Sequence, residues 1–439
     1  MKVYLPFEPE YVLVTAMTKD ISKLSENKIS AIKKARNEIA KEVLDRFSSG
    51  YPADRSLSSS LRARKFLGSR DRRFISESIF SLFRWWGWIK KCLKAECEIR
   101  KLAAFPDLLG NALDNASFIN ESLEKLSFCE LPAKLSQEFS LPISNFKQQE
   151  LLPGFFTSNL SDALKINDLT QSFQTRPPIW IRTKNGAREK VVSELRRQNA
   201  KFNMPENFPN AVKILKSETS LYSMPEFKNG LFEVQDIASQ MIGLIAAPKP
   251  GEKWLDACAG AGGKTLQMAD MMNGKGSILS QDFDEKKIEE LKRRTARASL
   301  SNVRTRIADA SKRDKRHESF FDGVLVDAPC SCSGTWRRNP DGRWRTQESE
   351  IDRFHKNQLS ILEATSQSVR SGGTLVYATC SVFGKENEGV ISEFTASNPS
   401  FKLCTFPDPI SGKIFEGILN VNPSEMDSDA VFVAKLKRS

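Results

Sequence analysis

Histidine is nearly absent from this sequence: its 439 residues include two, His317 and His355. Histidine is the side chain that most often serves as an acid, a base or a metal ligand near neutral pH. Two histidines leave little room for acid–base catalysis or metal binding by this side chain. Any catalysis must rest on other groups, and cysteine and aspartate are the candidates.

Paired cysteine spacing is also missing, since none of the eight cysteines forms a C-x-x-C pair. This usage fits neither a structural zinc site nor a disulfide framework, so we expect no metal and a reducing compartment. The N-terminus lacks a basic segment followed by an apolar core, and no apolar run reaches membrane-spanning length. We expect a cytoplasmic protein that acts as a monomer and has no membrane partner.

What the sequence does have is length and positive charge. A chain of 439 residues predicts two or three domains. The formal net charge of +12 and a pI near 9.2 favour a polyanionic partner, although excess lysine can also serve solubility alone. Charge by itself does not decide between these two interpretations.

The first third of the chain predicts an all-α domain. Residues 1–20 are an apolar, proline-containing leader to which we assign no function. Apolar residues then recur at helical spacing, which predicts a helical domain over 21–145. The expected helices cover 22–47, 56–64, 69–88 and 89–97.

Cations and aromatic residues are interleaved in this helical domain. Trp85, Trp86 and Trp88 lie among a cluster of lysines and arginines, and that combination suits phosphate contact and base stacking. The alternative, which this segment favours equally, is a solvated basic face over a core filled by tryptophan. The cations are Arg62, Arg64, Lys65, Arg70, Arg72, Arg73, Arg84, Lys90 and Lys91.

The rest of the chain predicts two further units. Residues 146–231 form a small α+β module that docks on the next domain, with strands at 177–182, 211–215 and 230–234 and a helix at 187–199. From 232 to 439 strands and helices alternate, which predicts a Rossmann-like α/β domain with a mostly parallel, doubly wound sheet. Its expected strands cover 254–257, 276–281, 303–307, 321–327, 373–379 and 430–436, and its expected helices 265–272, 285–299, 348–369 and 386–398.

Two of these strands deliver a cysteine where they end. Residues 323–326 are apolar without alternation, as expected for a parallel strand covered on both faces, and 373–380 repeat this pattern. The first strand is followed by Asp327-Ala328-Pro329-Cys330 and the second by Cys380. An intracellular cysteine is by default a small buried hydrophobe, but the carboxylate beside Pro-Cys favours chemistry.

A glycine-rich turn follows the first strand of this domain, and such a turn lets a ligand approach backbone N–H groups closely. Neither an NTPase phosphate loop nor a dinucleotide fingerprint fits, because the glycines that they need fall at Cys258 and Thr265. Asp282 stands where a ribose hydroxyl pair would be bound, and Asp309 where an adenine amine would be met. Together these positions predict adenosine binding. The turn comprises Cys258, Ala259, Gly260, Ala261, Gly262, Gly263 and Lys264.

The residues around these positions resemble the motifs of the RNA cytosine-5 methyltransferases of the Nol1/Nop2/Sun family. Two positions depart from its pattern: Gly260-Ala261 stands where the family usually has Ala-Pro, and Lys184 where it often has Asn. Residues 53–55, 68–72 and 83–85 resemble the NusB-like helical domain of its bacterial ribosomal RNA members, and 235–236 and 337–341 are similar to those members too. The shared catalytic motifs are Asp256-x-Cys258-Ala259 with Gly262-Gly263-Lys264-Thr265, Asp327-Ala328-Pro329-Cys330-Ser331 and Tyr377-Ala378-Thr379-Cys380-Ser381.

This resemblance implies S-adenosylmethionine as the cofactor and RNA, chiefly small-subunit ribosomal RNA, as the partner. The cofactor would contact the glycine-rich turn, Asp282, Asp309 and Asp327. The Cys380 thiolate would add to C6 of cytosine, Asp327 would hydrogen-bond the base at N3, and Cys330 would assist release of the product. A helix N-terminus near Lys385 and nearby cations would ionise Cys380, while Cys332 would be a bystander.

Two other functions stay open. A DNA cytosine-5 methyltransferase would use Cys330 as its nucleophile and leave Cys380 dispensable, which the second cysteine motif makes improbable. An RNA-binding ribosome assembly factor without activity is suggested by Gly260-Ala261 and the basic surface, but the intact Cys380, Cys330 and Asp327 weigh against it. Methylation of a tRNA cytosine is the remaining enzymatic alternative.

Overall fold

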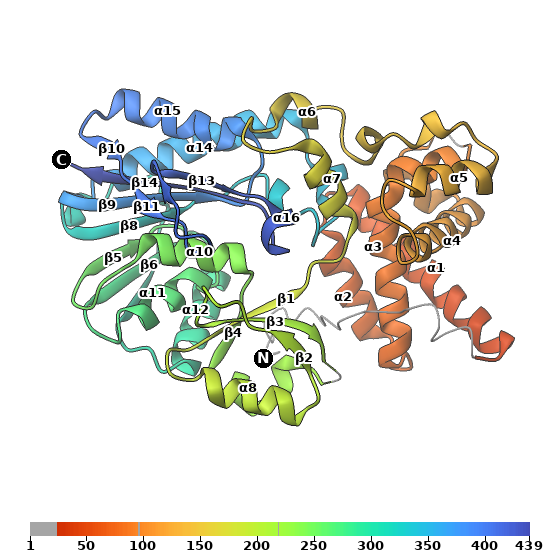
Figure 1. Ribbon diagram of the computed structural model, residues 1–439, viewed down its shortest axis with the longest axis horizontal. Helices are drawn as coiled ribbons and strands as arrows, with labels where there is room; N and C mark the ends of the chain where they lie inside the picture. The colour runs from red at the N-terminus through yellow and green to blue at the C-terminus, as the bar shows by residue number, and fades with distance from the viewer. Residues whose placement is uncertain (1–23, 95–96, 218) are drawn as a thin grey trace.

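The computed structural model describes residues 24–94, 97–217 and 219–439, and the expected leader at 1–20 lies outside these ranges. Figure 1 shows a helical domain at the right, a small sheet below the centre and a large sheet covered by helices at the left. These parts follow the predicted order of helical domain, α+β module and α/β domain. In the described ranges, no helix is long and apolar enough to span a membrane.

The helical domain is built as predicted from helices alone, and its likeness to NusB stays a prediction. One boundary is wrong: α3 runs without a break through the position between 88 and 89 where we expected two helices to meet. Trp88 and Ile89 are both fully buried, so the apolar face of the helix continues across that point. The elements are α1 (Glu26–Ser48), α2 (Ala53–Ala63), α3 (Ser69–Cys92), α4 (Pro106–Leu123) and α5 (Leu131–Phe139), with the 3-10 turns η2 (Ile99–Ala104), η3 (Ile143–Phe146) and η4 (Gln148–Leu151).

The tryptophans of α3 belong to the core of this domain. Trp85 and Trp88 are 0% exposed and Trp86 is 4% exposed. The indole N–H of Trp85 donates to the side chain of Asn120 at 3.1 Å, and that of Trp88 donates to the carbonyl oxygen of Lys147 at 2.9 Å. The predicted base-stacking role is therefore wrong, and the alternative of a tryptophan-filled core is correct.

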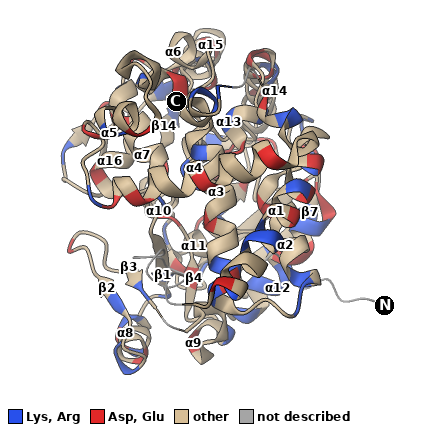
Figure 2. Cartoon of the chain, turned by 90° about the vertical axis from the view of Figure 1, so that its right-hand side faces the viewer, with Lys and Arg blue, Asp and Glu red and all other residues tan. Residues whose placement is uncertain are grey.

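Several cations that we expected on an RNA-binding face also serve the fold. Arg84 is buried and pairs with Glu77 at 2.8 Å, and Arg64 pairs with Glu42 at 2.5 Å. Arg72 donates to backbone carbonyl oxygens at the α2–α3 junction. Other cations remain on the surface: Figure 2 shows basic positions along α2 and mixed charge along α1.

The small α+β module has a four-stranded antiparallel sheet with the order β2-β3-β1-β4. Because β4 pairs with β1, this sheet extends to Val234, beyond the boundary at 231 that we expected. Strand β2 is a further addition that the sequence did not indicate. The elements from the linker onward are α6 (Phe156–Asn159), α7 (Ile166–Gln174), β1 (Ile179–Thr183), α8 (Arg188–Arg197), β2 (Lys201–Asn203), β3 (Ala211–Lys216), η5 (Leu221–Ser223), α9 (Pro225–Lys228) and β4 (Phe232–Val234).

The large sheet has the order β10-β14-β9-β8-β5-β6-β7, with β13 paired to β14. Strands β5 to β9 are parallel and β14 is antiparallel to β9, so the predicted mostly parallel sheet is confirmed. Figure 1 shows α10, α11 and α12 on one face and α14 and α15 on the other. The strands are β5 (Lys253–Asp256), β6 (Ser277–Asp282), β7 (Val303–Ile307), β8 (Phe321–Asp327), β9 (Val369–Thr379), β10 (Phe401–Leu403), β13 (Ile418–Val421) and β14 (Val431–Arg438). The helices are α10 (Ile237–Ala246), α11 (Gly263–Met271), α12 (Glu285–Arg297), α14 (Glu348–Ser366) and α15 (Glu388–Ser397).

One helix of this domain is shorter than predicted. We expected it to reach residue 369, but α14 ends at Ser366 and Val369 begins β9. Val369 is the register partner of Phe321 at the start of β8, so pairing with a neighbouring strand takes these residues out of the helix. The remaining short elements are η6 (Lys315–His317), η7 (Ser333–Thr335), α13 (Gly342–Arg345), η8 (Gly384–Glu386), β11 (Phe406–Pro407), β12 (Ile414–Phe415) and α16 (Pro423–Met426).

The connection between β8 and α14 ties the helical domain to the large sheet. Arg343 of α13 is 0% exposed and donates to the carbonyl oxygen of Leu151 at 3.1 Å. The indole N–H of Trp344 donates to the carbonyl oxygen of Phe83 in α3 at 2.6 Å. Uncovering a buried cation is costly, so the helical domain is a structural partner of this connection rather than a detachable module.

Candidate active site

The candidate site lies where β5, β8 and β9 end, at Asp256, Asp327 and Thr379. Strand β8 is hydrogen-bonded to β5 on one side and β9 on the other, and all three run parallel. Their carboxyl ends therefore meet at one edge of the sheet, the usual position of ligand sites in doubly wound folds. The sequence placed these three strand ends side by side, and the structure confirms that arrangement.

Three thiols gather at this edge. The Sγ atoms of Cys330 and Cys380 are 3.3 Å apart, and the three Sγ atoms of Cys330, Cys332 and Cys380 lie within 4.8 Å of one another. Cys332, which we expected to be a bystander, belongs to this thiol cluster. Its φ of 56° is in the left-handed region, which a non-glycine residue seldom adopts and which is often found at functional sites.

The thiols do not ionise in the way that we expected. Although the contact with Cys330 lowers the pKa of Cys380, the contact with Cys332 and burial raise it well above its usual value. The helix that we expected to start near Lys385 begins later, because α15 starts at Glu388, and Lys385 itself pairs with Asp352 at 2.5 Å. The prediction of a Cys380 thiolate stabilised by a helix N-terminus is therefore wrong for the ligand-free protein.

The other two thiols are shifted in opposite directions. Hydrogen bonding to Cys332 and Cys380, together with burial, raises the pKa of Cys330 well above its usual value. Hydrogen bonds from Cys330 and Cys380 lower the pKa of Cys332, the most exposed of the three. Cys332 is thus a member of the cluster in its own right, and its C-x-C spacing with Cys330 is the signal that sequence reasoning passed over.

Asp327 and Lys264 face each other beside the thiols. Lys264 lies in the first turn of α11 and its Nζ donates to Asp327 Oδ2 at 2.7 Å. Burial alone would lower the pKa of Lys264, but the adjacent Asp327 carboxylate raises it, so the lysine stays charged. Because the Asp327 side chain is still 32% exposed, this carboxylate can meet a ligand at the strand ends.

Asp256 ends β5 directly beneath the glycine-rich turn. It is 1% exposed and accepts a hydrogen bond from Thr265 Oγ1 at 2.6 Å. Burial raises the pKa of Asp256 to about 7. The Thr265 hydroxyl in turn accepts from Ser280 at 3.1 Å, so a buried polar network holds the turn on β5 and β6.

Hydrogen bonds from two neighbouring segments hold the glycine-rich turn in place. Gly260 N donates to Asp282 Oδ2 at 2.9 Å, and Arg294 of α12 donates to the carbonyl oxygen of Ala261 at 2.7 Å. At Gly262 φ is +89° and a Cβ atom would lie 2.0 Å from the side chain of Leu291, so any other residue would strain the backbone and displace that side chain. The departure from Ala-Pro at Gly260-Ala261 therefore leaves an ordered turn.

The residues around this turn fit an adenosine group. Added Cβ atoms at Gly260 and Gly263 would meet nothing within 4 Å, so the backbone there is open to a ligand. Asp282 is 6% exposed, whereas Phe283 is 71% exposed and Ile307 52% exposed at the ends of β6 and β7. Sequence reasoning missed these two apolar residues, although Ile307 ends a predicted strand and Phe283 lies two residues after another.

Asp309 lies at the outer end of this series. It is exposed, and its Oδ1 accepts hydrogen bonds from the backbone and hydroxyl of Ser311 at 3.0 and 2.7 Å. These hydrogen bonds lower the pKa of Asp309. The side chain thus closes a local turn, and contact with adenine stays a prediction.

A buried carboxylate joins the two cysteine-bearing segments. Glu386 is 0% exposed and accepts hydrogen bonds from the backbone N–H of Ser331 at 2.9 Å, from Gln358 at 2.9 Å and from the Ser381 hydroxyl at 2.6 Å. Ser331 and Ser381 directly follow Cys330 and Cys380. Glu386 therefore fixes the spacing of the two thiols, a role that no local pattern indicated.

Comparison with known proteins gives a consistent result. Residues 243–437 match the family described as 16S rRNA methyltransferase RsmB/F. The probable ribosomal RNA small subunit methyltransferase B of Bacillus subtilis is 34% identical over 235 residues, which cover 52% of each chain. The ribosomal RNA small subunit methyltransferase B of Citrobacter koseri is 32% identical over 314 residues, 66% of this chain and 70% of the relative.

Solved structures extend the similarity beyond the α/β domain. The crystal structure of PH0851 superposes with a TM-score of 0.72 at 25% identity and covers 92% of this chain and 99% of its own. The structure of NSun6 from Pyrococcus horikoshii with SFG has a TM-score of 0.53 at 18% identity, covering 62% of this chain and 94% of its own. The second likeness concerns the fold alone.

Proposed function

Because this chain belongs to the 16S rRNA methyltransferase RsmB/F family, we propose that it transfers a methyl group from S-adenosylmethionine to C5 of a cytosine in small-subunit ribosomal RNA. The observation that carries this proposal is the pair of strand-end thiols, Cys330 and Cys380, 3.3 Å apart at the same sheet edge as Asp327 and the glycine-rich turn. Cofactor and nucleophile would meet there.

S-adenosylmethionine is the cofactor of this family, and SFG, found with one structural neighbour, is an analogue of it. We assign Asp282 to its ribose hydroxyls, Asp309 to its adenine amine and the turn 258–264 to close backbone contact. Phe283 would offer adenine an apolar face, and Asp327 would border the group. When bound, the cofactor supplies an electrophilic methyl group.

Cys380 is the proposed nucleophile. C5 of cytosine is too weak a nucleophile to accept a methyl group unless a thiolate first adds at C6 and turns the ring into an enamine. The raised pKa means that Cys380 begins as a thiol and must lose its proton as it adds. Asp327 is among the groups that raise this pKa, and we assign it to pass the proton to N3 of the base, where negative charge develops.

Cys330 is the proposed release group. After methyl transfer the proton on C5 must leave, and its electron pair restores the C5–C6 double bond as the Cys380 thiolate departs. The sulfur of Cys330 is 3.3 Å from that of Cys380, and its raised pKa keeps Cys330 a thiol. We assign this thiol to give its proton to the departing Cys380 sulfur and to take the C5 proton in exchange, so that both cysteines end as thiols. Glu386 would keep the two thiols at this spacing.

The target must be an unstacked nucleotide, because C5 and C6 are inaccessible inside a stacked helix. The net charge of +12 supports binding to the phosphate backbone around it. Because the tryptophans of the helical domain are buried, its exposed cations, such as Arg62 and Lys65, are the groups that would make this contact.

Bisulfite sequencing of ribosomal RNA from a deletion strain tests the function. One cytosine of the small-subunit RNA should lose its protection when the gene is removed and regain it with the wild-type gene but not with Cys380→Ala. If every protected cytosine survives the deletion, the ribosomal substrate is wrong. The unusual Gly260-Ala261 pair does not favour the alternative of an RNA-binding assembly factor without activity, since Arg294 holds this turn in place.

A further inference from the structure

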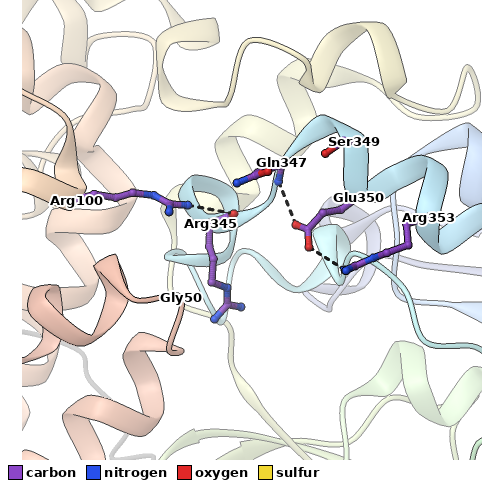
Figure 3. Close-up of a pocket in the computed structure, with 7 residues that line it drawn as sticks. All are labelled: Gly50, Arg100, Arg345, Gln347, Ser349, Glu350 and Arg353. Carbon is purple, nitrogen blue, oxygen red and sulfur yellow. Dashed lines mark hydrogen bonds and ion pairs between the residues drawn. The ribbon is translucent and has the colours of Figure 1, made fainter.

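A cavity of about 480 Å³ lies where the helical domain meets the α/β domain (Figure 3), and we call it the junction cavity. The helical domain contributes Gly50, which follows α1, and Arg100 of η2. The α/β domain contributes Arg345 at the end of α13, with Glu350 and Arg353 in the first turns of α14. The cavity therefore exists only because both domains are held together.

Positive charge dominates the junction cavity, with three guanidinium groups against one carboxylate. That carboxylate is engaged within its own helix: Glu350 accepts from the backbone N–H of Gln347 at 3.1 Å and from Arg353 at 2.9 Å. An anion is thus the favoured ligand. The guanidinium fork matches phosphate and carboxylate oxygens in pairs, which makes arginine suited to either.

Arg100 and Arg345 differ in what their guanidinium groups contact. Arg100 donates to the carbonyl oxygens of Trp344 and Arg345 at 3.4 and 3.3 Å, so it helps to hold the wall in place. The Arg345 side chain points across the cavity towards Gly50 in Figure 3. Its ion pair with Asp341 is 3.6 Å long, which is too long for a good hydrogen bond. Arg345 therefore keeps donors to offer to a ligand.

The lining narrows the class of anion. Among the described residues, those that line the junction cavity are Gly, Arg, Gln, Ser and Glu, without an apolar or aromatic side chain. A free nucleotide usually needs a surface on which its base can stack or be buried. A sugar–phosphate backbone needs only charge and hydrogen-bond donors, so it fits this lining better.

The junction cavity is linked to the candidate active site along the chain and by charge. The chain runs from Cys330 through the connection after β8 to Arg345, and the charge of Arg345 contributes to the lowered pKa of Cys332. The Cys332 thiol in turn lies within 4.8 Å of that of Cys380. A strand whose target base reaches Cys380 would therefore have its neighbouring phosphates close to Arg345.

We propose that the junction cavity binds phosphate groups of the RNA strand next to the target cytosine, through Arg345 and Arg353. The identity of the strand rests on the proposed function, while the presence of a phosphate site does not. Fixing the flanking backbone across two domains would hold a splayed-out base in place without reading its sequence.

The test compares RNA binding by wild type and by Arg345→Gln/Arg353→Gln, with a small-subunit ribosomal RNA transcript over a range of salt concentrations. Loss of two phosphate contacts should make the slope of log affinity against log salt shallower by about 1.4 and weaken binding at low salt roughly tenfold or more. KM for RNA should rise, while kcat at saturating RNA and the affinity for S-adenosylmethionine should stay near wild type.

The matched control is Arg197→Gln/Arg370→Gln, which removes two exposed, ion-paired arginines from α8 and from the opposite end of β9. It should leave the salt slope unchanged. Arg353→Gln alone guards against misfolding, since this side chain is 69% exposed, and should still make the slope shallower by about 0.7.

Unchanged RNA affinity and salt slope in both the double and the single variant would overturn the proposal. A second outcome would also overturn it: inorganic phosphate raises the melting temperature of wild type but not that of the double variant, while both proteins bind RNA equally well. The cavity would then bind small anions and not the RNA strand. RNA affinity is measured in the absence of S-adenosylmethionine, so it does not depend on methyl transfer. A wild type that binds RNA through these arginines but methylates no cytosine would therefore refute the proposed function and leave the phosphate site standing.

Discussion

The tryptophans that the sequence singles out in the helical domain are buried, whereas two apolar residues that it does not single out in the α/β domain are exposed. The helical domain hides Trp85 and Trp88 completely, although they stand in a run of basic residues that resembles an RNA-binding surface. The α/β domain leaves Phe283 71% exposed and Ile307 52% exposed at the ends of two strands. The tryptophans that the sequence suggests for RNA contact are structural, whereas Phe283 and Ile307 are exposed at the strand ends where we propose that the cofactor binds.

The same contrast holds for charge. Arg84 in the helical domain is sealed in an ion pair with Glu77, whose side chain is 12% exposed. Lys264 in the α/β domain pairs with Asp327, whose side chain is 32% exposed and open to the strand ends. Residue type alone thus does not separate packing from function, whereas exposure at a sheet edge does.

The largest expected effect is the loss of turnover when either strand-end thiol of the α/β domain is removed. These two side chains should matter for the reaction and not for packing. Cys380→Ala should abolish turnover and form no covalent complex with RNA. Cys330→Ala should still add to the base and accept the methyl group but fail to eliminate it, so an adduct that survives denaturing electrophoresis should accumulate.

Cys404→Ala is the matched control for these variants, since Cys404 is a partly buried thiol that the proposed mechanism does not use. It should turn over like wild type. An adduct with Cys380→Ala and none with Cys330→Ala would reverse the roles and support a DNA-type mechanism. Full turnover in both variants would make both thiols structural.

Trp88 provides the opposite case in the helical domain. Trp88→Ala should lower the free energy of unfolding by about 3–5 kcal/mol, because it empties a fully buried site. Phe66→Ala, at a side chain that is 76% exposed, should change it by no more than about 0.5 kcal/mol. Urea unfolding measures both. A folded Trp88→Phe variant with reduced RNA affinity would restore the base-stacking role.

Phe283 should matter for the cofactor and little for packing, whereas Asp282 should matter for the cofactor and also holds the glycine-rich turn through Gly260. Calorimetry should show that Asp282→Ala loses most affinity for S-adenosylmethionine and that Phe283→Ala loses about 1–3 kcal/mol, the usual value for a stacked ring. Phe66→Ala is the control in the other domain and should bind normally. Wild-type affinity in Asp282→Ala would refute the ribose assignment.

The smallest effect is a pH dependence that arises from Asp256. Its pKa is about 7 in the folded protein against an ordinary value of 3.8, so the folded state binds this proton more tightly than the unfolded state. Stability should therefore fall as pH rises from about 4 to 7 and level off above that range. Asp256→Asn should flatten the dependence of the melting temperature on pH.

Asp236 provides an independent check on this interpretation. Burial and the nearby Asp429 raise the pKa of Asp236 to about 7 as well, so it contributes with the same sign. Adding Asp236→Asn to Asp256→Asn should reduce the remaining slope further in the same direction. An Asp256→Asn variant whose melting temperature depends on pH just as that of wild type does would contradict the Asp256 assignment, and an unchanged slope on adding Asp236→Asn would contradict the Asp236 assignment.

Much of the candidate site could be predicted because it lies at strand ends. The order of the motifs along the chain predicted that Asp256, Asp327 and Cys380 would meet, since parallel strands bring their carboxyl ends to one edge. Glu386 could not be predicted, because its partners Ser331 and Gln358 come from distant segments. Neither could the junction cavity, whose walls belong to different domains.

The sequence by itself determined the elements, the parallel sheet and the residues at its edge, because apolar runs, glycine turns and motif order are local or sequential properties. Only the tertiary structure decided what is buried and what is charged. Trp88 is hidden and Phe283 exposed because segments far apart in the chain cover one and not the other. The Cys380 thiol stays protonated for the same reason, since its pKa depends on burial and on sulfur and carboxylate groups from other strands.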